Sequence, residues 1–104
     1  MRLGVVVTDG QFAQQAIALL KGADARGWDL RCFLTDSGVQ LLGHEAFRDF
    51  LKTNSEAHVS LCELSVDRYP GADPHAGGLA ERVIIGGQYQ DAELVKNSDQ
   101  VIVL

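Results

Sequence analysis

The fold class of this chain is decided by the stretch Arg2-Leu3-Gly4-Val5-Val6-Val7-Thr8. Its three consecutive valines are β-branched, and β-branched residues favour extended strands. An apolar run without polar alternation is typical of a strand that is covered on both faces, as in a parallel sheet whose crossover helices lie on both sides. The stretch therefore predicts a parallel sheet between two layers of helices.

The remainder of the sequence alternates helical and strand-like segments. Apolar residues at a helical period indicate a helix over residues 11–26, and Gly86-Gly87 opens a further helix over residues 88–97. The clearest helical stripe is formed by Leu42, Ala46, Phe47, Phe50 and Leu51. Further strands are expected over residues 28–35, 58–61, 82–85 and 100–104, with a short helix over 62–69. Because crossovers between parallel strands are right-handed, this alternation predicts one three-layer α/β/α domain over residues 1–104 with a mainly parallel sheet.

Length and charge limit the function classes. A chain of 104 residues has the size of one domain. Its formal net charge of −5 argues against direct binding to nucleic acid or to an anionic membrane, because both need a basic surface. No apolar run approaches the roughly 20 residues of a transmembrane helix, and the first one is too short for a signal peptide. Two cysteines are too few for a secreted disulfide framework, so a cytoplasmic location is expected.

Polar residues follow several of the expected strands. In a parallel sheet the carboxyl ends of all strands lie at one edge, so Thr8-Asp9, Thr35-Asp36 and Cys62 are expected to gather there. Turn formation is one explanation for Asp9 and Asp36, because Asp followed by Gly suits the turn between a strand and a helix. Ligand binding is the other, because open α/β sheets bind ligands at this edge. Both explanations stay open.

Cys62 is the candidate nucleophile, because it lies where the third strand gives way to a short helix. The positive end of a helix dipole and its unpaired N–H groups favour the thiolate, which is the reactive form. The neighbouring Glu63 and the aspartates of the edge act in the opposite direction and raise the thiol pKa. A buried structural cysteine is the alternative. Cys32 lies inside an apolar strand, so we expect it to fill the core, and we expect no disulfide between the two cysteines.

Neither a metal nor an organic cofactor is expected. His44, His58 and His75 share no metal-ligand spacing with one another or with the cysteines. The first strand is not followed by a phosphate-binding glycine motif, and the sequence lacks the G-x-S-x-G pattern of serine hydrolases. His75 lies in the Gly- and Pro-rich loop after Cys62, where it is either an acid or base for the thiol or a solvated loop residue.

Three further stretches of the sequence, in the order in which they occur, carry a resemblance to a known protein family. They are residues 27–39, which end in Asp36-Ser37-Gly38-Val39; Val59-Ser60-Leu61-Cys62 with Asp67-Arg68; and residues 86–104, which begin Gly86-Gly87-Gln88-Tyr89. Together with the first strand, they resemble the DsrE/DsrF-like sulfur-relay family, which includes the TusD-type sulfurtransferase subunits. In that family a strand ends at a cysteine and an arginine follows, as Cys62 and Arg68 do here. The resemblance covers nearly the whole chain.

The resemblance implies a five-stranded parallel sheet and a sulfur-relay function. Cys62 falls where family members with an active cysteine carry sulfur as a persulfide, and Arg68 either helps to hold the anion or solvates the helix end. The family implies a homo-oligomer, as a trimer or hexamer, or a hetero-oligomer with related subunits. It also implies protein partners that donate and accept sulfur. The loop over residues 70–81 is the candidate lid over Cys62.

The sequence also departs from the family pattern. Tyr69-Pro70 follows Arg68 where relatives often have glycine, and the turn Asp9-Gly10-Gln11-Phe12 differs from the usual turn after the first strand. Some members of the family lack the cysteine, and one fold supports several functions. Two other functions therefore stay open. One is a non-catalytic assembly or regulatory subunit of the same fold, and the other is a small-ligand-binding domain that uses the edge of the sheet.

Overall fold

The computed structural model describes residues 1–54, 57–73 and 83–104. Within this part of the chain, no helix is long and apolar enough to cross a membrane. The elements, with η marking 3-10 helices, are β1 (Arg2–Val7), η1 (Gly10–Phe12), α1 (Ala13–Ala25), β2 (Asp29–Leu34), η2 (Asp36–Gly43), α2 (Glu45–Thr53), β3 (His58–Cys62), α3 (Glu63–Arg68), β4 (Val83–Gly86), α4 (Gln88–Asn97) and β5 (Gln100–Val103).

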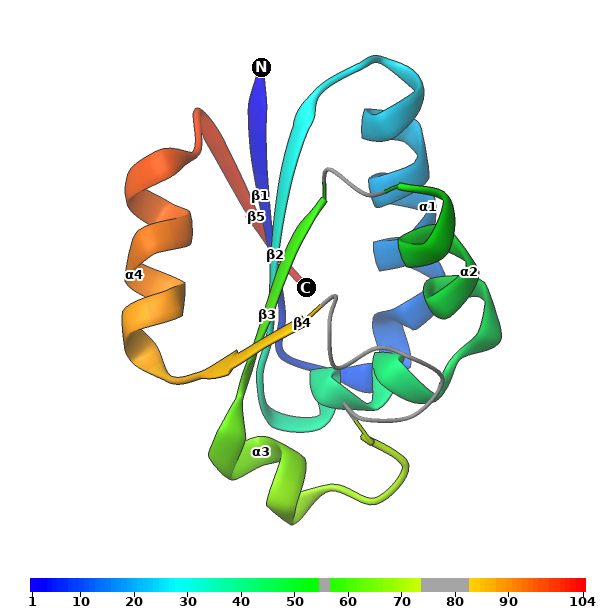
Figure 1. Ribbon diagram of the computed structural model, residues 1–104, viewed down its shortest axis with the longest axis vertical. Helices are drawn as coiled ribbons and strands as arrows, with labels where there is room; N and C mark the ends of the chain where they lie inside the picture. Colours follow the sequence, from blue (N-terminus) through cyan, green and yellow to red (C-terminus); the bar gives the residue numbers. More distant parts are fainter. Residues whose placement is uncertain (55–56, 74–82) are drawn as a thin grey trace.

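The strands form one sheet in the order β4-β3-β2-β1-β5, and every pair of neighbours is parallel. Figure 1 shows α1 and α2 on one side of the sheet and α4 on the other, with α3 beyond the carboxyl end of β3. The predicted three-layer α/β/α fold is confirmed, and the five-stranded sheet is parallel throughout. Since β4 and β5 lie at opposite edges, α4 crosses the middle of its face and contacts β1, β2 and β3.

The two faces of the sheet are covered unequally. The main core lies between the sheet and helices α1 and α2, where alternate strand residues such as Val5 and Val7 are fully buried. On the opposite face, the buried cluster consists of Val6, Phe33 and Leu94. Because α4 is the helix that covers this face, residues toward the β4 edge stay accessible: Ile84 is 54% exposed. This second face carries both the candidate thiol and a pocket.

Two helix boundaries differ from the prediction. The segment 11–26 begins as the 3-10 turn η1, which is capped by Asp9, and becomes α-helical at Ala13. The single helix predicted through Leu42 is wrong, because His44 has an extended backbone with a ψ of 124° that separates η2 from α2. Leu42 belongs to η2 and is still buried in the same core. The buried residues of α2 are Phe47, Phe50 and Leu51.

The turn after β2 folds back against the end of β1. The Thr35 N–H donates to the Val7 carbonyl at 3.0 Å, and the Gly38 N–H donates to the Thr35 carbonyl at 2.9 Å. This path brings Gly38 so close to β1 that an added Cβ would overlap the carbonyl oxygen of Val7. The close approach therefore requires glycine, and it holds η2 against the carboxyl edge of the sheet.

Candidate functional site

Cys62 is the last residue of β3 and the N-cap of α3. Its backbone is extended, with φ −81° and ψ 119°, and the helix begins at Glu63. Because side chains alternate along a strand, Cys62 points to the α4 side of the sheet, where it packs against the small buried cluster of that face. The residue is partly exposed. The sheet thus holds the thiol in place while leaving it accessible.

The surroundings of the Cys62 sulfur favour the thiolate. Partial burial raises the pKa of the thiol, but hydrogen-bonding groups outweigh this effect and the pKa of Cys62 is lowered. These groups are the hydroxyl and N–H of Ser65, the N–H of Leu64 and the hydroxyl of Thr35. Neither Glu63 nor an aspartate of the edge is among the causes of this shift, and the donors around the sulfur give the pKa its lowered value.

Ser65 connects the thiol to the end of β2. Its side chain is buried, and its Oγ accepts a hydrogen bond of 2.9 Å from the Asp36 N–H. That bond uses a lone pair of the oxygen, so the hydroxyl hydrogen remains available to the Cys62 sulfur. Asp36 has a left-handed backbone with φ 48°, which is uncommon for a residue with a side chain. Such unfavourable backbone conformations gather at functional sites.

Replacing Ser65 with alanine is expected to raise the pKa of Cys62, because the thiolate loses a hydroxyl donor. The free energy of unfolding should fall by about 1 kcal/mol, because the Asp36 N–H loses its acceptor. The ultraviolet absorbance of the thiolate against pH measures the first effect, and urea unfolding measures the second. The matched control is Ser98→Ala, since the buried Ser98 hydroxyl has no hydrogen-bond partner among the described residues. An unchanged thiol pKa in Ser65→Ala would contradict the assignment.

Asp9 takes part in the turn after β1. Its carboxylate accepts hydrogen bonds from the Gln11 N–H at 3.0 Å and from Gln11 Nε2 at 2.7 Å, and a longer one of 3.5 Å from the Ser37 hydroxyl. The bonds from Gln11 and, to a lesser extent, from Ser37 lower the pKa of Asp9. The Ser37 hydroxyl also accepts from the Gly10 N–H at 3.0 Å. These contacts favour the turn explanation for Asp9.

The structure brings only some of the predicted site residues close to Cys62. The Asp36 N–H donates to Ser65, which in turn contacts the Cys62 sulfur. The Asp9 carboxylate instead accepts a hydrogen bond from Ser37. Arg68 is exposed in the last turn of α3. A helix rises about 1.5 Å per residue, so Arg68 lies roughly 9 Å beyond Cys62. His75 and most of the candidate lid over 70–81 lie outside the described residues.

Cys32 is a core residue, as predicted. It is 2% exposed in the core under α1 and α2, and burial raises the pKa of its thiol to about 12. Both cysteines are free thiols. They point to opposite faces of the sheet, because Cys32 belongs to the main core and Cys62 packs on the α4 side. This placement explains why no disulfide joins them.

In the ranges described above, no group of three or more His, Cys, Asp or Glu side chains is arranged to hold a metal ion. The carboxyl edge of the sheet thus offers one accessible thiol, with donors that favour its ionised form, and a turn built by Asp9. Comparison with known proteins finds no matching family model and no significant match to a curated protein.

Proposed function

We propose that this protein carries sulfane sulfur as a persulfide on Cys62, as a subunit of a sulfur relay. The observation that supports the proposal is the lowered pKa of a partly exposed thiol at the end of a buried strand. A thiolate is the nucleophile in such exchange, and accessibility is needed for a donor to approach. Cys32 meets neither condition, because it is buried and its pKa is raised to about 12.

The proposed exchange is balanced without an added electron carrier. The Cys62 thiolate attacks the outer sulfur of a donor persulfide, and a new S–S bond forms at the Cys62 sulfur. The S–S bond of the donor breaks, and its electron pair leaves with the donor thiolate. One persulfide is consumed and one is formed. Attack by an acceptor thiolate on the outer sulfur then returns Cys62 to its starting state.

The same chemistry indicates the cellular compartment and the partners of the proposed sulfur carrier. A persulfide carrier needs a compartment in which cysteines stay reduced, so we place the protein in the cytoplasm. Its partners in the proposal are proteins that donate and accept sulfur, together with further copies of this chain or related subunits. Exposed apolar residues on both edge strands support the association of subunits. They are Ile84, Ile85, Val101, Ile102 and Val103.

Intact-mass measurement tests sulfur carriage. Reduced protein is incubated with inorganic polysulfide, desalted and weighed as the wild type and as the variants Cys62→Ser and Cys32→Ser. The wild type and Cys32→Ser are expected to gain one sulfur atom, about 32 Da, and Cys62→Ser is expected to gain none. A second thiol should then remove the added sulfur from the wild type. A wild-type chain that stays unloaded would contradict the proposal.

The second candidate function is a non-catalytic assembly subunit. The exposed apolar side chains of β4 and β5 favour it, because these strands lie at the two open edges of the sheet, where another subunit can pair or pack. The two functions are separated by combining the mass measurement with light scattering on the same samples. Association of subunits without sulfur loading would favour the assembly function, whereas loading on Cys62 favours sulfur carriage.

A further inference from the structure

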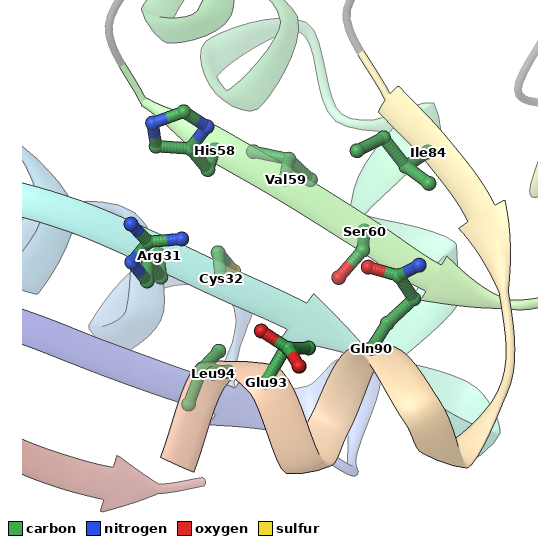
Figure 2. Close-up of a pocket in the computed structure, with 9 residues that line it drawn as sticks. All are labelled: Arg31, Cys32, His58, Val59, Ser60, Ile84, Gln90, Glu93 and Leu94. Atoms are coloured by element: carbon green, nitrogen blue, oxygen red, sulfur yellow. The ribbon is translucent and has the colours of Figure 1, made fainter. Parts of the chain in front are cut away.

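A pocket opens on the α4 side of the sheet, between α4 and the strands β2, β3 and β4. Its volume is about 80 Å³. A water-sized group needs roughly 10–15 Å³ by this measure, so the pocket accommodates about five to eight such groups. Figure 2 shows the side chains that line it. Its polar and apolar lining includes Arg31, His58, Ser60, Ile84, Gln90 and Glu93.

Arg31 brings an incompletely paired guanidinium group to this pocket. Its Nε is buried and has no hydrogen-bond partner among the described residues. The nearest carboxylate oxygen, Oδ2 of Asp29, lies 4.0 Å from Nη2, beyond hydrogen-bond distance. A buried guanidinium nitrogen without a partner is costly, because it has lost water and gained nothing in return. The Arg31 side chain as a whole is 30% exposed, and a guanidinium can bind a carboxylate through two parallel hydrogen bonds.

Glu93 brings a carboxylate to the same pocket from α4. Its Oε2 accepts a hydrogen bond of 3.1 Å from Asn97 Nδ2, which fixes the side chain on the helix. Of the residues that the structure describes, Arg31 pairs with Asp29, and no salt bridge joins Arg31 to Glu93. Figure 2 places Arg31 beside His58 and places Glu93 near Ser60 and Gln90. The pocket therefore presents a cation and an anion that do not neutralise each other directly.

We propose that this pocket binds a small zwitterion of the α-amino acid class. The carboxylate of the ligand binds the partly exposed guanidinium of Arg31, and its ammonium group binds Glu93. The hydroxyl of Ser60 and the amide of Gln90 supply further hydrogen bonds, and Ile84 contacts an apolar side chain. Charge complementarity at both ends selects a molecule with both groups over one with either alone, because each missing group leaves a protein charge without its partner.

This site is separate from the proposed sulfur carrier. Cys62 does not line the pocket. It pairs with Gly86 of β4, and the Gln90 side chain lies over that glycine, with Cγ 2.6 Å from an ideal Cβ position. Gln90 thus lines the pocket at its end nearest to Cys62. Ligand binding and sulfur loading can therefore be tested independently.

Three ligands of matched size test the proposal on the wild-type protein. L-Alanine carries both charges, L-alaninamide lacks the carboxylate, and L-lactate has a hydroxyl in place of the ammonium group. Each is titrated into isotope-labelled protein, and the backbone amide signals of Arg31, Ser60 and Glu93 are followed by NMR. L-Alanine is expected to shift them with a dissociation constant on the order of 1 mM, because so small a ligand makes few contacts. The other two ligands should bind at least about tenfold more weakly.

Charge-removing variants check the location. Arg31→Gln and Glu93→Gln are each expected to weaken L-alanine binding by at least about tenfold. Their matched controls are Arg48→Gln and Glu45→Gln, which remove the same charges from α2 on the other side of the sheet. Equal binding of all three ligands would overturn the proposal. So would the absence of shifts at these amides with L-alanine at about 50 mM, far above the expected dissociation constant.

Discussion

Gly38→Ala is expected to lower the free energy of unfolding by about 3 kcal/mol or more. An added Cβ would overlap the carbonyl oxygen of Val7, and that oxygen is fixed by the hydrogen bond of 3.0 Å from the Thr35 N–H. Neither partner is the flexible end of a side chain. Relief of the overlap therefore requires η2 to move away from the sheet and to open the main core.

The matched control for this substitution is Gly22→Ala. Gly22 lies inside α1, and nothing is within 4 Å of an added Cβ. Alanine favours a helix over glycine by about 0.5–1 kcal/mol, so this variant should gain stability. Urea unfolding of both variants, followed by circular dichroism, measures the difference. A Gly38→Ala protein as stable as the wild type would show that η2 does not pack against β1 in the way described.

Iodoacetamide is expected to label the native protein once, at Cys62, and to leave Cys32 untouched. The pKa of Cys62 is lowered from 9.0 and that of Cys32 is raised to about 12. At neutral pH a much larger fraction of Cys62 than of Cys32 is therefore thiolate. Burial of Cys32 slows its reaction further, because the reagent cannot reach the sulfur.

The pH dependence of this labelling has a defined sign. The rate at Cys62 rises with pH as the thiolate forms, and the midpoint of the rise lies below pH 9.0. Peptide mapping locates the label, and Cys32→Ser should react at the wild-type rate. Cys62→Ser should stay unlabelled until urea unfolds it and exposes Cys32. Labelling of both cysteines in the folded wild type would refute the placement of Cys32 in the core.

The fold is predicted well by local sequence because its strands are nearly continuous apolar runs. The three valines of β1 and the helical period of residues 11–26 indicate those elements and their approximate ends. The break at His44 is not visible in the pattern, because Leu42 continues the apolar spacing across it. A helical stripe reports which residues face the core, and both η2 and α2 pack on that core. It does not report the extended residue between them.

The candidate site is predicted less completely. Cys62 stands out because it follows a strand, but Ser65 reaches the thiol only through the first turn of α3 and a hydrogen bond to Asp36. A serine three residues after a candidate cysteine is the signal that points to it. Arg31 gives no such signal, because a charged residue in a strand is ordinarily a solvated one. Arg31 becomes a candidate binding residue only in the folded sheet, where its Nε is buried without a hydrogen-bond partner among the described residues.

Because the two faces of the sheet are covered unequally, different parts of the molecule are expected to unfold locally at different free energies. Leu94 is the buried residue of α4, and all four residues of β5 are exposed, whereas β1 and β2 contribute buried residues to both faces. Segments with few buried apolar contacts open at a lower free energy than the rest of a domain. The unit formed by α4 and β5 is therefore expected to detach locally while β1, β2 and β3 stay folded. Since α4 supplies Gln90 and Glu93, the amino acid pocket exists only while this helix is docked.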